Sequence, residues 1–336
     1  MEKSNYNYGI GILRIFFCYM VISFHFYGVM NLDNRFYFLR ELAVPMFVLI
    51  SFYFGYRVIT SNDREKYWKR GVRLFVPYLF WGIIGYIGLW IVSFFTAIPH
   101  ASIRDLIMQI AFGSNDRLNA PLWFQWEIIV LTILFILLYK IFKKYTSIVL
   151  VVLMVVCYIV QYTNINLYLY TMMPYELYND IGRFFEVLPL ASVGFIIADI
   201  KVIDKLENKR WLSVVFLILA IICIIFVERI PTPFITFAYA GVKHLIVATL
   251  LFLSFYLIPF EKLPDSITKI IKWLASYTMG IYFIHWMVGK VCDALWMSKF
   301  GVQKTLLETF VIFVLCLIIC VIIDKIPIKY SSMLVR

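Results

Sequence analysis

Apolar residues dominate this chain in long runs that short polar segments separate. The first run, from Tyr8 to Met30, holds about 23 mostly apolar residues, which is enough to cross a bilayer as a tilted helix. Ten such runs occur, and each predicts a membrane-spanning helix. They lie at about 8–30, 41–59, 74–98, 120–141, 146–162, 184–200, 211–228, 239–259, 273–290 and 305–324.

The first run carries two ionisable side chains, Arg14 and His25, eleven positions apart. At about 100° and 1.5 Å per residue, both lie on one helix face, about 16 Å apart along the axis. An arginine at membrane depth costs about 2.5 kcal/mol or more, so it needs a polar partner or a water-filled cavity. The first helix is therefore predicted to carry a polar seam.

The basic residues between the runs predict the orientation. If both termini face the cytoplasm, the inside segments hold 20 Lys and Arg and the outside segments hold 9. Cytoplasmic segments are enriched in these residues, so the count favours N-in and C-in. We expect an all-α polytopic membrane protein with about ten transmembrane helices. Because no long polar stretch interrupts the runs, we expect residues 1–336 to form a single membrane-embedded domain, with no appended soluble domain.

Composition supports the same fold class. Of the 336 residues, 63% are hydrophobic and only 15% are charged, whereas soluble domains average about 25% charged residues. The net charge of +11 could suggest nucleic acid, but the basic residues lie in short segments between spans, so no nucleic-acid partner is expected. The six cysteines lie mostly inside apolar runs without a CxxC pair, which indicates buried apolar residues, with no metal site.

A basic cluster, Lys69, Arg70 and Arg73, marks the predicted cytoplasmic start of the third span. Arg70 and Arg73 are three positions apart and share a helix face, and paired guanidinium groups suit a phosphate ligand. The alternative is that the cluster only anchors a cytoplasmic helix end, and spacing alone favours this alternative.

Three ionisable side chains inside the spans are candidates for chemistry. The imidazole of His25 titrates near neutrality and could take a proton from a hydroxyl, or it could be a hydrogen-bonded structural residue. Glu127 could orient His25, meet Arg14, or partner another buried polar group. His285 could line the same site, although a structural role is the favoured interpretation.

Several of these residues occur in stretches that resemble acyltransferase family 3, the integral-membrane family that includes bacterial O-acetyltransferases of glycans. Arg14 and His25 match the family's arginine–histidine signature in the first span. The segment VPMFVLISFYFGY at 44–56 is similar to its Val-Pro-x-Phe-Phe-x-x-Ser-Gly segment, with Ser51 matching and Phe52 in place of the glycine.

Three further stretches extend the resemblance over nearly the whole chain. The segment KRGVRLFVPY contains Arg70 and Arg73, which match an Arg-x-x-Arg pair ahead of a proline. The segment SYTMGIYFIH is similar to a terminal element whose aromatic and histidine positions fall at Tyr282 and His285. The segment LWFQW, which contains Trp123, is similar to the family's entry to a middle span.

The resemblance implies an O-acyltransferase of the bacterial inner (cytoplasmic) membrane. The expected donor is acetyl-CoA or another short acyl-CoA on the cytoplasmic side, with no permanently bound cofactor. The expected acceptor is a hydroxyl of a cell-surface or lipid-linked glycan. Membrane lipid is the surrounding partner, and the sequence leaves a homo-oligomer open.

The resemblance also implies roles for individual residues. His25 would be the general base, and Arg14 would stabilise the oxyanion or position the donor. Glu127 is a further catalytic candidate because of its place inside a span. The CoA phosphates would be held by Arg70, Arg73 and Lys69.

Other possibilities stay open at this point. An acyl-enzyme on Ser51 or a tyrosine is compatible with the sequence, and Trp123, Tyr282 and His285 are further candidates for the lining of the site. The alternative function is a transporter or flippase for a glycolipid or small solute, since polar residues in spans also mark transport paths. Transporter folds often show internal repeats, and the sequence contains no such repeat. A scaffold without activity is disfavoured by the ionisable residues in the spans.

Overall fold

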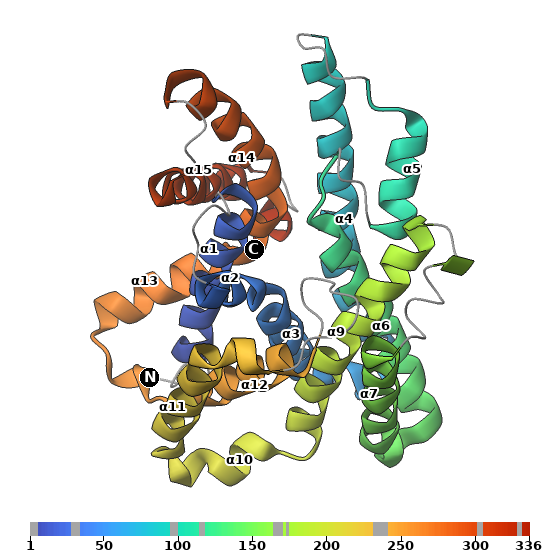
Figure 1. Ribbon diagram of the computed structural model, residues 1–336, viewed down its shortest axis with the longest axis vertical. Coiled ribbons are helices and arrows are strands. Elements are labelled where there is room, and N and C mark those ends of the chain that lie inside the picture. Colours follow the sequence, from blue (N-terminus) through green and yellow to red (C-terminus); the bar gives the residue numbers. More distant parts are fainter. Residues whose placement is uncertain are drawn as a thin grey trace. The chain divides into compact units, whose positions relative to one another are not determined.

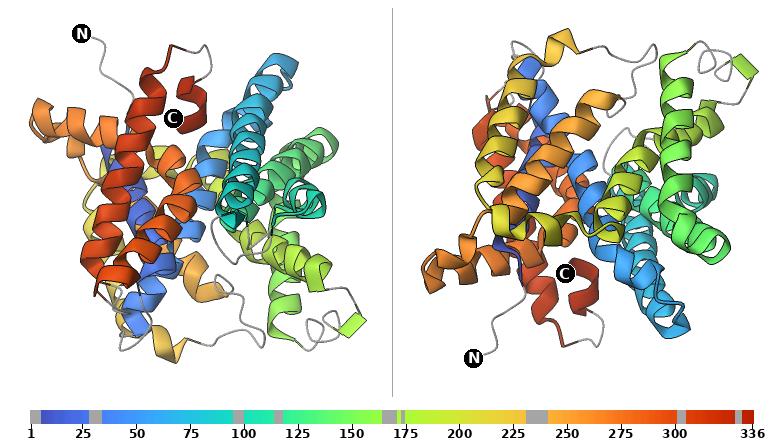
Figure 2. Two further views of the ribbon diagram at one scale, coloured as in Figure 1. Left: turned by 90° about the horizontal axis from the view of Figure 1, so that it is seen from above. Right: turned by 90° about the horizontal axis from the view of Figure 1, so that it is seen from below.

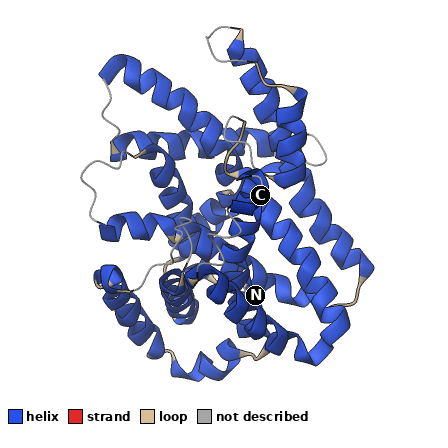
Figure 3. Cartoon of the chain, turned by 45° about the vertical axis from the view of Figure 1, so that its right-hand side comes forward, coloured by secondary structure: helices blue, strands red, loops and turns tan. Residues whose placement is uncertain are grey.

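The computed structural model describes residues 6–27, 34–94, 100–113, 118–163, 171–172, 175–230, 241–300, 305–327 and 331–336. Within these ranges every regular element is a helix and no strand occurs (Figure 3), which confirms the all-helical prediction. The chain divides into two compact units, called unit 1 and unit 2 below. Unit 1 comprises Met1–Val21, Asn31–Arg57 and Leu138–Ser276, and unit 2 comprises Ile22–Met30, Val58–Leu137 and Tyr277–Arg336.

The units interleave along the sequence. Helix α1 (Tyr8–Phe26) continues from unit 1 into unit 2, because the division falls between Val21 and Ile22. Neither unit is therefore a separate stretch of sequence, and the single-domain expectation stays a prediction.

Unit 1 is built around two helix pairs, α11 with α12 and α7 with α9 (Figure 1). Its helices besides the first part of α1 are α2 (Asn34–Glu41), α3 (Ala43–Ile59), α7 (Thr146–Tyr162), α9 (Tyr175–Asp199), α10 (Val202–Leu206), α11 (Leu212–Ile225), α12 (Val242–Leu257) and α13 (Asp265–Ser276).

Glycines allow close helix crossings in unit 1. A Cβ at Gly194 of α9 would lie 2.4 Å from the backbone oxygen of Leu49 in α3, and one at Gly9 of α1 would lie 1.8 Å from the backbone oxygen of Phe255 in α12. In lipid, helices associate largely through such close packing of small residues, because the hydrophobic effect does not drive them together. These two crossings therefore hold α3, α9, α1 and α12 in place.

Unit 2 contains the end of α1 together with six further helices, of which α14 and α15 form a pair (Figure 2) and α4 packs on α5. These helices are α4 (Arg64–Ser93), α5 (Ile103–Phe112), α6 (Leu122–Phe142), α14 (Thr278–Phe300), α15 (Leu306–Lys325) and α16 (Ser331–Val335).

Polar contacts fix the C-terminal segment to unit 2. The Arg336 guanidinium donates to the Asp324 carboxylate at 2.5 Å and to the Tyr277 hydroxyl oxygen at 3.0 Å. The Tyr277 hydroxyl in turn donates to Asp324 at 2.9 Å, and the indole N–H of Trp81 donates to the backbone oxygen of Leu334 at 3.0 Å. Helix α16 is thereby joined to the start of α14, to α15 and to α4.

The lengths and composition of the described helices can be compared with the ten predicted membrane spans. By length and composition, six helical stretches of the described residues could cross a membrane, or seven if the bent pair Val202–Lys209 and Leu212–Ile225, with 108° between its parts, counts as one. The protein is therefore a multi-pass membrane protein, while the count of ten and the N-in, C-in orientation stay predictions. The six stretches are Tyr8–Phe26, Asn34–Ile59, Arg64–Ile91, Leu122–Tyr162, Ile181–Asp199 and Leu306–Lys325.

Several predicted boundaries differ from the structure, and two of them have a clear local reason. Helix α4 begins ten residues before the predicted span at 74, because Asp63 accepts hydrogen bonds from the backbone N–H of Glu65 at 2.9 Å and caps the helix there. The Lys66 N–H is the largest cause that lowers the pKa of Asp63. The predicted span 273–290 is divided, since α13 ends at Ser276 and α14 begins at Thr278. The strongly amphipathic α13 was mistaken for the start of an apolar span.

Gly194→Ala should destabilise unit 1. The added methyl group collides with the backbone of α3, and overpacking of this kind typically costs about 1–3 kcal/mol. Gly88→Ala in α4 is the matched control, because a Cβ there meets no atom within 4 Å and alanine favours a helix by up to about 1 kcal/mol. Thermal unfolding in detergent should show a lower midpoint for Gly194→Ala alone. Equal midpoints for the two variants would show that the α3–α9 crossing is not close.

Candidate active site

Two imidazoles lie side by side in unit 2. His25 is in the last turn of α1 and half-buried, and His285 on α14 is fully buried. Their ring centroids are 5.4 Å apart, and the ring of Trp286 meets His25 edge-on at 5.2 Å. Two histidines from opposite ends of the sequence are thus neighbours.

The hydrogen bonding of His285 fixes its tautomer. Its Nδ1 is bonded to the backbone oxygen of Tyr282, and a carbonyl oxygen can only accept, so Nδ1 carries the proton. The Nε2 of the neutral ring then presents a lone pair, and within the described part of the chain it has no hydrogen-bond partner. An unsatisfied buried nitrogen costs stability, typically about 1–3 kcal/mol. This nitrogen is therefore a buried acceptor that no described residue uses.

A short segment before α6 positions the part of α14 that carries His285. The Tyr282 hydroxyl donates to the backbone oxygen of Pro121, and its ring packs on Phe124 at 5.2 Å. The buried Asn119 amide donates to the backbone oxygen of Phe283 at 3.0 Å. These contacts hold α14 one turn before His285.

Helix α6 contributes two buried candidates to unit 2. Trp123 and Glu127 are 9% and 3% exposed and lie one turn apart. The neighbouring Gln125 amide donates to the backbone oxygen of Leu74 at 3.0 Å, which fixes α6 on α4. The proposed pairing of Glu127 with His25 or with Arg14 stays a prediction.

The contacts of the basic cluster at the start of α4 distinguish Lys69 from the two arginines. The Lys69 ammonium is 2.6 Å from a carboxylate oxygen of Glu65, and both side chains are exposed. The half-buried Arg70 donates to the hydroxyl of Thr132 in α6 at 3.4 Å, and Arg73 is exposed. Arg70 and Arg73 therefore remain the stronger candidates for a phosphate, and Lys69 has an acidic partner already.

The other two predicted site residues belong to unit 1. Helix α1 is uninterrupted, so Arg14 and His25 do lie on one helix as predicted. Burial raises the pKa of Tyr6, which precedes α1, and the positive charge of Arg14 opposes this shift, which places Arg14 near that phenol. Ser51 is half-buried in α3.

Sequence reasoning missed a buried contact between a histidine and a carboxylate in unit 1. The Nε2 of His244 in α12 is 3.3 Å from a carboxylate oxygen of Glu41 in α2, both side chains are buried, and the ring of Phe38 packs on the imidazole at 4.9 Å. The adjacent Arg40 is 1% exposed. The available signal was the charged pair Arg40–Glu41 directly before an apolar run.

The described residues contain no group of three or more His, Cys, Asp and Glu side chains placed as metal ligands would be. A family model described as an acyltransferase domain matches residues 7–325 of the chain. The chain belongs to acyltransferase family 3. The match confirms the resemblance seen in the sequence, and the protein is a membrane acyltransferase. No curated protein and no solved structure matches this acyltransferase.

Tyr282→Phe should weaken both the fold and the activity of the acyltransferase. The substitution removes one hydrogen bond to Pro121, typically worth about 0.5–1.5 kcal/mol, and loosens the turn before His285. Tyr86→Phe in α4 is the matched control, because the Tyr86 hydroxyl makes no hydrogen bond within the described residues. Unfolding midpoints and acyl-transfer rates should fall for Tyr282→Phe only. Equal unfolding midpoints and equal rates for the two variants would show that Tyr282 does not position His285.

Proposed function

We propose that this acyltransferase moves an acetyl or other short acyl group from cytoplasmic acyl-CoA to a hydroxyl of a cell-surface or lipid-linked glycan in the bacterial inner membrane. His25 is the proposed general base. The observation that supports this proposal is the pair of the half-buried His25 and the buried His285 in a chain of the acyltransferase family.

The proposed reaction is direct transfer. The acceptor hydroxyl oxygen attacks the thioester carbonyl carbon while His25 takes the hydroxyl proton. The carbon–sulfur bond then breaks, and the proton passes from His25 to the CoA thiolate. General base catalysis of this kind contributes about 10²–10⁴-fold to a rate.

His285 supports the base in this scheme. While His25 holds the proton it is an imidazolium, and every ring nitrogen of an imidazolium is a donor. The Nε2 lone pair of His285 is an acceptor that needs no water, and the two rings are 5.4 Å apart. A buried acceptor stabilises the charged form more strongly than an exposed one.

Arg14 is better suited to hold the donor than to stabilise the oxyanion. It is about 16 Å from His25 along the helix axis, whereas an oxyanion donor must lie about 3 Å from the carbonyl oxygen that the His25-activated hydroxyl attacks. The flexible pantetheine arm of CoA can extend over such a distance. Arg70 and Arg73 are proposed to hold the CoA phosphates, since exposed and half-buried guanidinium groups can bind phosphate bidentately.

His25→Gln should abolish most acyl transfer. Glutamine fills a similar volume but cannot take up a proton, so the rate should fall by about 10²-fold or more. His285→Leu should lower the rate less, because it removes only the acceptor. The exposed His100, which precedes α5, provides the control variant His100→Gln. Transfer from radiolabelled acetyl-CoA to membrane glycan is the measurement, and a correctly inserted His25→Gln protein with full activity would refute the role of His25.

Acetyl-CoA binding should depend on the two arginines of α4. Each charge-assisted contact is worth about 1.5–3 kcal/mol, so Arg70→Ala/Arg73→Ala should bind at least 10-fold more weakly in detergent. Arg64→Ala/Lys66→Ala removes two exposed charges from the first turn of the same helix and should bind like wild type. If both double variants lose the same affinity, general positive charge is responsible and no phosphate clamp exists.

A further inference from the structure

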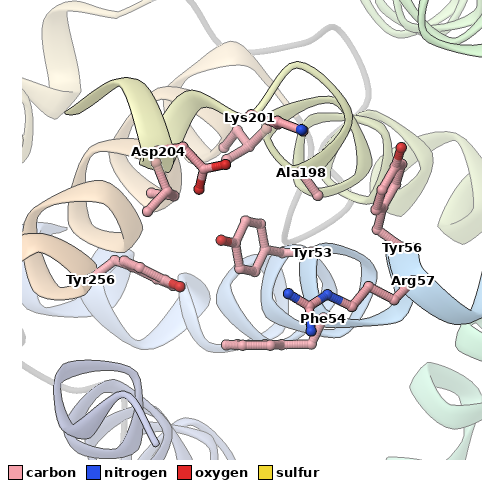
Figure 4. A pocket seen from close by; sticks show the side chains of 10 residues that line it. Tyr53, Phe54, Tyr56, Arg57, Ala198, Lys201, Asp204 and Tyr256 are labelled. Carbon is pink, nitrogen blue, oxygen red and sulfur yellow. The ribbon is translucent and has the colours of Figure 1, made fainter. Parts of the chain in front are cut away.

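A cavity in unit 1 has no role in the reaction described above. Its volume is about 650 Å³, within the range of about 300–1,000 Å³ that small-molecule sites occupy. Three parts of the unit line it (Figure 4): α3 with Tyr53 and Arg57, the turn from α9 into α10 with Lys201 and Asp204, and α12 with Tyr256. Every lining residue that the structure describes belongs to unit 1, so the cavity needs no contribution from unit 2.

The cavity lies where two of the stretches that could cross a membrane end. Arg57 is two positions before the end of Asn34–Ile59, and Lys201 is two positions after the end of Ile181–Asp199. Basic side chains at the ends of spans reach the level of the lipid headgroups. Each of the two cations is therefore placed at a membrane surface.

The contacts between α3 and α9 show that this is the same surface. Gly194 packs closely on Leu49, since a Cβ there would lie 2.4 Å from the Leu49 backbone oxygen. Five positions further along α9, Asp199 accepts a hydrogen bond from the Tyr56 hydroxyl at 2.8 Å, seven positions after Leu49 on α3. The two helices therefore run in the same direction, and both stretches end on one side of the membrane.

The wall of the cavity changes from apolar to cationic toward that surface. On α3, the ring of Phe54 is 51% exposed and precedes Arg57 by three positions, which is about 4.5 Å along the helix axis. On α9, Ile197 and Ala198 line the wall before Lys201. A phospholipid changes in the same order, from its acyl chains to its phosphate.

The charged side chains of the lining are available to a ligand. Within the described residues, neither Arg57 nor Lys201 has a carboxylate oxygen within 4.0 Å, so Asp204 is paired with neither. In Figure 4, Asp204 and Tyr256 lie on one side of the Tyr53 ring and the two cations on the other. The rings of Tyr53 and Tyr256 are 5.5 Å apart. The lining therefore has a cationic end and an end made of a carboxylate and aromatic rings.

We propose that this cavity binds the headgroup of a zwitterionic phospholipid, one that carries a phosphate and a primary ammonium group. The phosphate binds Arg57 and Lys201. The ammonium group binds the Asp204 carboxylate and the rings of Tyr53 and Tyr256. The acyl chains pass the apolar side of the cavity into the bilayer. The inference concerns the lipid around the protein, so it holds whatever the acyl donor and acceptor are.

Other phosphate esters leave part of the lining without a partner. An anionic headgroup such as phosphatidylglycerol offers no cation to Asp204. A soluble phosphate ester makes no use of the exposed ring of Phe54. A free phosphoethanolamine and a phosphatidylethanolamine headgroup share the same polar chemistry, so the test must separate these two sources.

The test is native mass spectrometry of the purified full-length protein in detergent, with phosphatidylethanolamine or phosphatidylglycerol added. The wild type should bind phosphatidylethanolamine in preference. Arg57→Gln/Lys201→Gln should weaken this binding by about 10-fold or more, since two charge-assisted contacts to the phosphate are lost. Asp204→Asn should keep the binding of phosphatidylglycerol and remove the preference for phosphatidylethanolamine, because only the ammonium group loses its partner.

Lys205→Gln is the matched control. It removes an exposed cation of α10 that does not line the cavity, so it should change neither affinity. Unfolding midpoints measured without lipid should be unchanged in all three variants, because the substituted side chains are exposed and have no ion-pair partner within the described residues.

Three results would overturn the inference. If the wild type binds both lipids equally, the cavity does not recognise the ammonium group. If Lys205→Gln weakens binding as much as Arg57→Gln/Lys201→Gln does, general positive charge is responsible. If glycerophosphoethanolamine, which has no acyl chains, displaces the lipid at equal concentration, the cavity is a site for a soluble phosphate ester.

Discussion

The cost of an ionisable side chain in a membrane interior is the constraint on which this acyltransferase depends. Each such group must be paired, hydrogen-bonded or used. In unit 1, the buried His244 and Glu41 are paired. In unit 2, the Nδ1 of His285 is hydrogen-bonded while its Nε2 has no partner among the described residues. A histidine whose Nε2 faces a carboxylate is a structural group, whereas one whose buried Nε2 faces no described partner is a candidate for catalysis.

The position of His285 is determined mainly by backbone contacts. Asn119 and Tyr282 connect α14 to the segment that enters α6, and both hydrogen bonds end on backbone oxygens. Such contacts do not depend on which residue type supplies the backbone oxygen. The segment around Pro121 can therefore hold α14 without itself taking part in chemistry. Proline is suited to this place, because it has no N–H that would need a partner.

Sequence patterns predicted most of the helices and part of the site. Long apolar runs identify helices well, because period and length both contribute to the signal, and Arg14 and His25 could be placed on one helix from their spacing alone. The sequence left open whether His285 lies beside His25, because contacts between distant helices leave no local pattern. For the same reason the pairing of His244 with Glu41 was missed. Lys69 was grouped with the arginines by its charge, although the spacing of four from Glu65 on one helix already indicates the ion pair that the structure shows at 2.6 Å.

The interleaving of the two units has a consequence for biosynthesis. Residues Ile22–Met30 belong with Tyr277–Arg336, so His25 leaves the ribosome long before His285 does. At about 5–20 residues per second, the 260 positions from His25 to His285 take about 13–52 s to synthesise. Throughout that time the polar end of α1 lacks the imidazole and the indole that surround it in the finished protein. The end of the first helix therefore reaches its final surroundings only after about five sixths of the chain has been made.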